Sequence, residues 1–331
     1  MIKGGLRDYL NEEKIIFDYS VILKRLSYGS FVGGKNKFLY LETPKCACST
    51  MKKIVASLEG FNIEERQVGA ESSPKMSMHK RKFHPLPNLN SFSKNEIEII
   101  MKDPAYVRFC IVRNPYARLA SAWSDKIRQM EPTHFHVIKE IRQFHNILDT
   151  EHSPTFDEFV IWVVSRDSDL ECDAHWESMI NLLLPKIINY THVLRTESLI
   201  QDFQKVLDDL NIETTAVEIL DGNKTNESLP IDWKEVYSEK TAELAYLHFE
   251  ADFKYYGYDK DSWLENSISS LSTSDELIKL QKKLKKLESN AVDGVVNRNK
   301  VIYQLLEKIK CAEMENNTTI HKIIRKINRL F

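Results

Sequence analysis

The sequence predicts an α/β fold, a parallel sheet flanked by helices, with a helical extension at its C-terminal end. Two observations indicate this class. Short apolar segments with strand character alternate with longer segments of helical periodicity, which is typical of parallel strands connected by helices. After Trp263 the composition changes to a Ser-rich stretch and then to a heptad-like repeat of apolar residues.

Three apolar segments are predicted as buried strands, at residues 37–42, 106–112 and 188–194. The main helices are expected at residues 49–58, 115–130, 197–210 and 238–255. Pro115 suits the first turn of the second of these helices, because that position needs no backbone N–H. Residues 69–92 are rich in Ser, Pro, His and Lys, which predicts a long loop.

A boundary near residue 265 separates the predicted domain, residues 1–264, from a tail, residues 265–331. The tail carries thirteen Lys and Arg against eight Asp and Glu, whereas the rest of the chain carries 33 against 40. Such a charge split indicates distinct segments. The heptad spacing favours a homo-oligomer formed through residues 275–331. The alternative is that the basic amphipathic end, residues 320–331, contacts the inner face of a membrane.

The composition is that of an ordinary folded protein. Of 331 residues, 42% are hydrophobic and 28% are charged, and the net charge of −2 argues against a nucleic-acid partner. Five scattered cysteines favour a reduced, cytoplasmic protein over a disulfide framework. No segment reaches the about 18 apolar residues of a membrane span, and the first residues lack a signal-peptide pattern. We therefore expect a protein without a membrane anchor.

The first motif is the segment Pro-Lys-Cys-Ala-Cys-Ser-Thr-Met-Lys-Lys at residues 44–53, which connects a predicted strand directly to a helix. Such a turn aims backbone N–H groups and a helix N-terminus at one point, which binds phosphate-like anions. It also offers a positive charge, two hydroxyls and small side chains. The sheet is therefore predicted to be P-loop-like, although the Walker pattern Gly-Lys-Ser/Thr is absent. The residues expected to hold the anion are Lys45, Cys46, Ala47, Cys48, Ser49 and Thr50.

Two other interpretations of this motif remain open. It could be an ordinary strand-to-helix turn in which Ser49 caps the helix. Alternatively, Cys46 and Cys48 could bind a metal, but no second nearby Cys/His pair has ligand spacing, so we expect no metal.

The second motif lies at residues 112–123, where a buried strand ends and a helix begins. Arg113 is delivered to the carboxyl edge of the sheet, where open α/β folds bind ligands, and Ser121 lies about two turns along the helix. A guanidinium fork and a hydroxyl together suit a second phosphate. The alternative is that Arg113 pairs with a surface carboxylate.

Taken together, the motifs resemble those of the Golgi-type carbohydrate sulfotransferases, sulfotransferase family 2, which includes the chondroitin and dermatan sulfotransferases. There the motifs read approximately Pro-Lys-x-Ala-Cys-Thr-x-x-Lys-Arg and Val-Arg-x-Pro-x-x-Arg-Leu-x-Ser-Ala-Tyr. Without an anchor, the chain resembles a soluble, bacterial member. The positions that match are Pro44, Lys45, Ala47, Cys48, Lys52, Val112, Arg113, Pro115, Arg118, Leu119, Ser121 and Ala122.

The resemblance implies an enzyme that moves a sulfuryl group from 3′-phosphoadenosine 5′-phosphosulfate (PAPS) to a hydroxyl of a glycan, either a polymer or a lipid-linked oligosaccharide. It implies that residues 45–50 hold the 5′-phosphosulfate. It also implies that Arg113 and Ser121 hold the 3′-phosphate. Lys224 and Asn226 are predicted to close over the nucleotide, and the alternative is that they form only a polar turn. Ser49, Met51 and Trp123 depart from the family's usual Thr, Trp and Tyr, and none of these changes removes a group that the chemistry needs.

Sulfuryl transfer is an in-line displacement that needs charge stabilisation and a general base. Lys45 is predicted to stabilise the developing charge. His84 is the first choice for the base, because related sulfotransferases have a catalytic histidine between the two motifs. His79 is the second choice and His175 the third.

Two alternatives belong to other classes of protein. A kinase or NTPase would need a Walker loop and a Mg²⁺-binding acid, and neither is found in the sequence. A non-catalytic scaffold would keep the nucleotide fold and act through its coiled coil. It would not need intact Lys45, Arg113 and Ser121.

Overall fold

The computed structural model describes residues 5–12, 19–62, 81, 84–166, 172–222 and 232–264. The chain divides into two compact units. The first comprises Met1–Arg118, Asp167–Glu227 and Phe249–Tyr258, and the second comprises Leu119–Arg166, Ser228–His248 and Asp259–Phe331. Several predictions lie outside the described residues: His79, Lys224, and the coiled coil and basic end of residues 265–331. The domain boundary near residue 265 stays a prediction.

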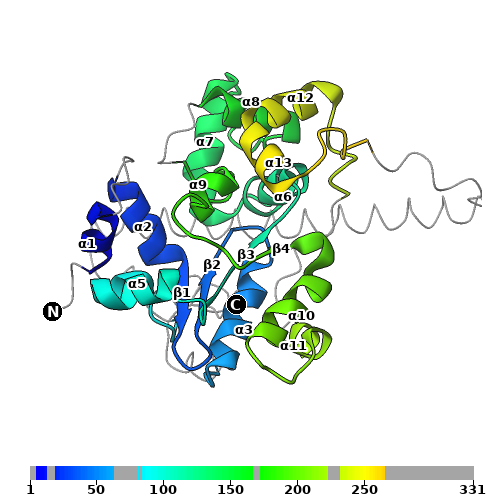
Figure 1. Cartoon of the computed structure of the whole chain (residues 1–331). Coiled ribbons are helices and arrows are strands. Elements are labelled where there is room, and N and C mark those ends of the chain that lie inside the picture. Colours follow the sequence, from blue (N-terminus) through cyan, green and yellow to red (C-terminus); the bar gives the residue numbers. More distant parts are fainter. Residues whose placement is uncertain are drawn as a thin grey trace, which may run out of the picture. The chain divides into compact units, whose positions relative to one another are not determined.

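The first unit contains a four-stranded sheet in the order β1-β2-β3-β4 (Figure 1). Strands β2, β3 and β4 run parallel, which confirms the predicted parallel sheet, whereas β1 pairs antiparallel with β2. The third predicted strand begins four residues later than expected, at His192. The strands are Ser30–Gly33, Phe38–Leu41, Val107–Val112 and His192–Arg195.

Strand β1 was not predicted from the sequence. It is only four residues long and ends in a tight hairpin that brings Gly33 opposite Phe38. A side chain at Gly33 would overlap the ring of Phe38, so this position of the hairpin requires glycine. The turn is completed by Lys37, which adopts a left-handed φ of 50°.

Helices flank the sheet, with α1, α2 and α5 on one side and α3, α10 and α11 on the other (Figure 1). The amphipathic pattern of α10 explains its position, because Phe203, Val206 and Leu207 are buried on one helix face. Helix α5 begins with a capping box, in which Ser93 and Glu96 each bond the other's backbone N–H. These helices are Gly5–Glu12 (α1), Tyr19–Gly29 (α2), Cys48–Leu58 (α3), Lys94–Lys102 (α5), Leu199–Asp209 (α10) and Ala216–Gly222 (α11).

The core of the first unit surrounds β2 and β3, in which every residue is buried. Tyr40 and Phe109 face each other across the two strands and stack with ring centroids 5.1 Å apart. Phe203 from α10 lies against Phe109 at 6.4 Å. Burial of each large apolar side chain contributes about 1.5–3 kcal/mol. This packing fixes the carboxyl edge of the sheet, from which the site residues project.

Shorter elements complete the first unit. Helix α9 packs against α13, and its N-terminus is bonded by the buried carboxylate of Asp252, which accepts from the N–H groups of Met179 and Ile180. The prediction of one helix over 238–255 becomes two helices, α12 and α13, with a break at Phe249. The shorter elements are η3 (Leu89–Ser91), α9 (Met179–Leu183), η6 (Thr196–Ser198) and α13 (Glu250–Tyr256).

The second unit is helical where the structure describes it, and α8 packs against both α7 and α12. Helix α6 leads into it from the end of β3. Among the described residues, no helix combines the length and hydropathy needed to cross a bilayer. Its elements are α6 (Pro115–Ala122), η4 (Trp123–Arg128), η5 (Pro132–His134), α7 (Phe135–Phe144), α8 (Phe156–Ser165) and α12 (Glu239–His248).

The helix predicted over 115–130 changes its winding after Ala122, where residues 123–128 form a π-helix. Side chains on this turn are therefore displaced from their α-helical positions. The indole N–H of Trp123 donates to the carbonyl of Pro154 at 2.9 Å, and its ring contacts Phe156 at 5.4 Å. These contacts depend on tertiary packing, which the local sequence pattern does not encode.

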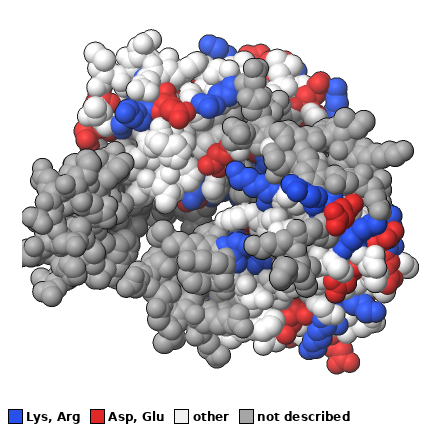
Figure 2. Space-filling model, turned by 90° about the vertical axis from the view of Figure 1, so that its left-hand side faces the viewer, with Lys and Arg blue, Asp and Glu red and all other residues white. Residues whose placement is uncertain are grey.

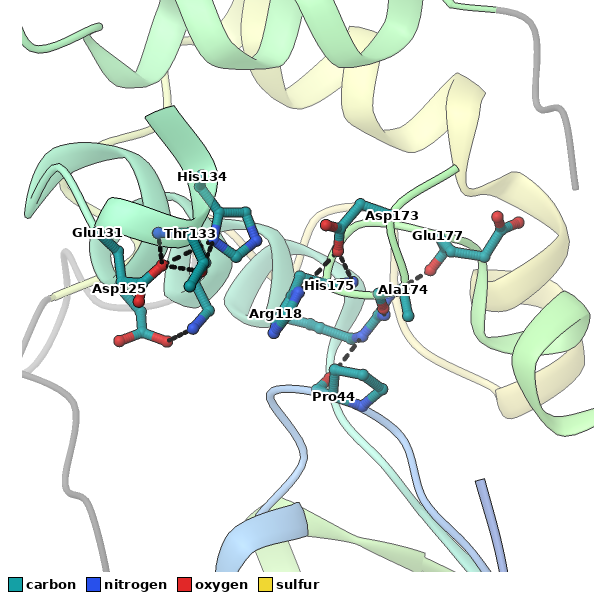
Figure 3. A network of polar contacts seen from close by, with 11 residues as sticks. Pro44, Arg118, Asp125, Glu131, Thr133, His134, Asp173, Ala174, His175 and Glu177 are labelled. Carbon is teal, nitrogen blue, oxygen red and sulfur yellow. Dashed lines mark hydrogen bonds and ion pairs between the residues drawn. The ribbon is translucent and has the colours of Figure 1, made fainter. Parts of the chain in front are cut away.

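A carboxylate anchors the turn before α7 (Figure 3). Glu131 accepts from the backbone N–H of Thr133 at 3.0 Å, from the Thr133 hydroxyl, and from Nδ1 of His134 at 2.9 Å. Burial raises the pKa of Glu131, but the hydrogen bonds from His134 and Thr133 lower that pKa more. The net result is a pKa below the ordinary value.

Candidate active site

The first motif forms a turn between β2 and α3 whose backbone is left-handed at two non-glycine residues. The φ angles are 68° at Lys45 and 55° at Ala47. Alternation of left- and right-handed residues turns successive N–H groups toward one concavity, which is an anion-binding nest. Helix α3 starts directly behind it, and the first turn of a helix has N–H groups that no intrahelical carbonyl can accept. The backbone therefore has the geometry that the predicted anion site requires, and binding by residues 45–50 stays a prediction.

Ser49 does not cap this helix. The N-cap is Ala47, so Ser49 lies within the first turn, and the interpretation of the motif as a Ser-capped turn is wrong. Lys45, Ala47, Cys48, Ser49 and Thr50 are all half-buried, so they line the turn without being enclosed in the core.

Cys46 is the exception among the predicted anion-binding residues, because its side chain is fully buried. Burial raises the pKa of the Cys46 thiol to about 12 despite the nearby guanidinium groups of Arg118 and Arg113. At neutral pH the side chain is therefore a neutral thiol that packs in the core. Only its backbone can contribute to the nest.

Arg113 follows directly after β3, on the same edge of the sheet as this turn. Its Nη1 donates to the carbonyl of Lys45 at 3.1 Å, so one guanidinium joins the end of β3 to the nest. This hydrogen bond uses one of the five N–H donors of an arginine. The prediction that Arg113 binds the 3′-phosphate stays a prediction.

Arg118, which is only 2% exposed, bonds to the first residue of the nest motif. Its Nε donates to the carbonyl of Pro44 at 3.1 Å, Nη1 to that of Glu177 at 2.6 Å, and Nη2 to that of Ala174 at 2.8 Å (Figure 3). In a trans peptide the C=O and N–H point in opposite directions. Because Arg118 holds the Pro44 carbonyl, the N–H of Lys45 is directed away from Arg118.

This role of Arg118 was missed in the sequence, where the residue appeared only as a position that matches the family motif. Its spacing provides a signal that could have been used. It lies one helical turn after Pro115, on a helix that begins at the carboxyl edge of the sheet, so a long cationic side chain there can reach the turn after β2.

Lys52, one of the positions that match the family motif, is buried and paired with a carboxylate. Its Nζ lies 2.5 Å from Oε2 of Glu42, and the two side chains are 4% and 7% exposed. Burial lowers the pKa of Lys52, but the Glu42 carboxylate outweighs this effect and the pKa is raised. This ion pair connects helix α3 to the end of β2.

His84 lies beside the same strand ends, with both ring nitrogens bonded to the backbone. Nε2 is 3.0 Å from the carbonyl of Lys52, and the N–H of Leu86 donates to Nδ1 at 3.2 Å. A carbonyl only accepts, so the proton is on Nε2 and the lone pair of Nδ1 is used by Leu86. The ring also packs edge-on against Phe31, with centroids 4.5 Å apart.

His175 has a different environment. The Oδ1 of Asp173 accepts from both the backbone N–H of His175, at 2.9 Å, and its Nδ1, at 2.7 Å (Figure 3). The two side chains are 28% and 30% exposed. Ala174, the residue between them, is bonded through its carbonyl to Arg118. The turn therefore lies next to the nest.

The carboxyl ends of β3 and β4 are joined by Glu197, which neither motif singled out. Oε1 of Glu197 accepts from the N–H of Asn114 at 2.8 Å, and Oε2 accepts from the hydroxyl of Tyr258 at 3.2 Å. The guanidinium of Arg195 lies 4.5 Å above the ring of Tyr258. These contacts brace the backbone on either side of Arg113.

Ser121 lies on α6 and is 5% exposed. Lys224 lies outside the described residues, so both assignments stay predictions. On the face shown in Figure 2, described Lys and Arg side chains are interspersed with Asp and Glu.

Comparison with known proteins identifies relatives of the whole site region. The model of the sulfotransferase family matches residues 28–259. Carbohydrate sulfotransferase 10 of Mus musculus and of Homo sapiens are 31% and 30% identical over 259 residues, covering 71% of this chain and 68% of each relative. Carbohydrate sulfotransferase 12 of Xenopus laevis is 25% identical over 253 residues, covering 69% of this chain and 60% of the relative. No solved structure matches.

Proposed function

Because the chain belongs to the sulfotransferase family, we propose that it transfers a sulfuryl group from PAPS to a hydroxyl group of a carbohydrate acceptor. The carbohydrate is inferred from the names of the relatives. One structural observation supports the donor site most directly. Two non-glycine residues, Lys45 and Ala47, are held left-handed at the start of α3. Such strain at a helix N-terminus is the mark of a preformed anion site.

The reaction is an in-line displacement at sulfur. The acceptor oxygen forms a bond to sulfur as the bond from sulfur to the bridging oxygen of the 5′-phosphosulfate breaks, and 3′-phosphoadenosine 5′-phosphate (PAP) leaves. Negative charge grows on the bridging oxygen as the bond breaks. Fixed N–H dipoles in the nest and the Lys45 ammonium are positioned to stabilise that charge without reorganisation.

The proposed contacts divide the nucleotide between the two motifs. Residues 45–50 take the 5′-phosphosulfate, and Arg113 with Ser121 takes the 3′-phosphate. Lys224 is proposed to contact the bound nucleotide. The hydrogen bond from Arg113 to the Lys45 carbonyl supports this division, since it links the 3′-phosphate ligand to the nest. The 3′-phosphate distinguishes PAPS from ADP and AMP.

The test is a thermal-shift titration with PAP beside ADP and AMP. At 100 times its Kd, a ligand that binds only the folded state contributes about 2.7 kcal/mol, which corresponds to a rise in Tm of about 4 °C for a chain of 331 residues. We expect this rise with PAP alone. It should be lost in Arg113→Ala and kept in Arg166→Ala, since Arg166 is an exposed residue paired with Glu140. Equal stabilisation by ADP would contradict the assignment.

The quaternary structure and cellular location are finer proposals that rest on the sequence. We propose a cytoplasmic homo-oligomer assembled through residues 275–331, with residues 320–331 as a peripheral membrane contact. Light scattering of the full chain and of the variant Leu280→Glu/Leu287→Glu tests the first, because two charges in the heptad seam should dissociate the oligomer. Flotation with anionic and zwitterionic vesicles tests the second, and fractionation of cells that express the chain tests the location.

A further inference from the structure

We propose that His175, oriented by Asp173, is the general base that takes the proton of the acceptor hydroxyl. This inference rests on the proposed sulfuryl transfer and identifies the residue that completes it. It replaces His84, the first choice from the sequence, with the third choice. Three observations carry it: the tautomer of His175, the position of its turn beside the nest, and the bonding of His84.

The tautomer of His175 follows from its partner. An ionised carboxylate only accepts hydrogen bonds, so the 2.7 Å contact between Oδ1 of Asp173 and Nδ1 of His175 requires the proton on Nδ1. The basic lone pair is then on Nε2. The same oxygen also accepts from the backbone N–H of His175, so the ring and its backbone are held by one carboxylate. This is the geometry in which a carboxylate fixes an imidazole for proton transfer.

The position of the turn follows from Arg118. One planar guanidinium donates both to Pro44, the first residue of the nest motif, and to Ala174, the residue between Asp173 and His175. Figure 3 shows Arg118 between Pro44 and the Asp173–His175 turn. The turn and the first residue of the nest motif are therefore held by the same guanidinium. With 28% of its side chain exposed, His175 is open to an acceptor from solvent.

His84 lacks these properties. Its Nε2 carries the proton that bonds the carbonyl of Lys52, and its Nδ1 accepts from the N–H of Leu86. To act as a base it would have to release a backbone N–H that it now satisfies. Its packing on Phe31 also holds the ring against the sheet. These contacts indicate that His84 fixes the backbone after the long loop.

The proton and electrons balance in one step. The acceptor O–H bond breaks, and its proton goes to Nε2 of His175. The oxygen bonds to sulfur, and the electron pair of the cleaved sulfur–oxygen bond leaves on PAP. Asp173 stays ionised and stabilises the imidazolium that forms. After the products leave, the imidazolium returns its proton to water.

The test measures kcat, acceptor KM and the binding of PAP in His175→Gln, Asp173→Asn and His84→Gln. The variant His192→Gln is the control, because His192 begins β4, at the opposite end of that strand from the carboxyl edge, and pairs with the exposed Asp209. The acceptors are oligosaccharides of desulfated chondroitin, heparosan and N-acetyllactosamine, with labelled PAPS as donor. Each kcat is measured from pH 5 to pH 9.

We expect His175→Gln to lower kcat about 10²- to 10⁴-fold with PAP binding unchanged, as loss of a general base does. Wild-type kcat should fall with a slope of one proton at acid pH, where an ordinary imidazole is protonated below about pH 6.5. This acid limb should be absent in His175→Gln. The acid limb should persist in Asp173→Asn, in His84→Gln and in the control. In Asp173→Asn kcat should fall less than in His175→Gln, because the base is still present but mispositioned.

Two results would overturn the inference: a wild-type kcat in His175→Gln, or an acid limb that survives in this variant and disappears in His84→Gln. A wild-type enzyme that neither binds PAP nor sulfates any of these acceptors would instead refute the proposed function, and the inference with it. The two failures are distinguishable because PAP stabilisation of the wild type is measured independently of turnover.

Discussion

Replacement of Arg118 is the sharpest perturbation of the site that the structure offers. Its guanidinium donates to three backbone carbonyls from two segments, at Pro44 and at Ala174 and Glu177. Hydrogen bonds from a charged donor contribute about 1.5–3 kcal/mol each, although such values do not add fully. We therefore expect Arg118→Ala to lower the free energy of unfolding by about 3–6 kcal/mol.

Arg118→Lys is the informative companion variant, because its ammonium restores the charge but cannot span three carbonyls in one plane. We expect it to recover less than half of the lost stability and little PAP binding, since the nest depends on the orientation of the Pro44 peptide. Urea unfolding and isothermal titration with PAP measure the two effects, with Arg166→Ala as the control. A loss below about 1 kcal/mol in Arg118→Ala, within the range of ordinary surface substitutions, would refute the reasoning.

The remaining predictions concern other parts of the fold. Glu42→Gln should lower the free energy of unfolding, measured in urea, by about 3–5 kcal/mol, because it leaves Lys52 charged and buried. The double variant Glu42→Gln/Lys52→Met should recover most of that loss. Equal stability of the single and double variants would contradict a buried ion pair. Glu131 has a pKa below its ordinary 4.5, so its contribution to stability is present above that pH and is lost as pH falls through the lower folded-state pKa. The Tm difference between wild type and Glu131→Gln should therefore be full at pH 7 and shrink progressively as the pH is lowered below 4.5. A difference that grows as the pH falls would contradict this prediction. Gly33→Ala should destabilise the β1–β2 hairpin by about 1–3 kcal/mol through overlap with the Phe38 ring, and an unchanged unfolding midpoint would show that the hairpin can move aside.

Much of the sheet could be predicted from the sequence, because its central strands are continuous apolar runs. Residues 38–41 and 107–112 are buried on both faces, so they form the pattern expected of parallel strands. Strand β1 could not be found in this way. Its four residues, Ser30–Gly33, are too few for a pattern, and its pairing depends on a hairpin closed by a glycine.

The site was predictable in its ligand type and less so in its internal contacts. The motif at residues 44–50 predicts an anion site by composition, and the backbone there has the required geometry. What each side chain does depends on partners far along the chain. Lys52 pairs with Glu42, and His84 is fixed by backbone groups that no local pattern reveals.

The left-handed residues of the nest have a consequence for how this site can change over generations. A non-glycine residue in that conformation costs about 1–2 kcal/mol, and here two such residues are held by guanidinium groups from the next strand and helix. Glycine loops avoid this cost locally, so their surroundings can vary. In this chain Arg113 and Arg118 bond the carbonyls of Lys45 and Pro44, so the left-handed backbone depends on both arginines. If either arginine were replaced, glycine at position 47 would relieve backbone strain at that residue. A sequence pattern that requires glycine would not detect the loop in its present form.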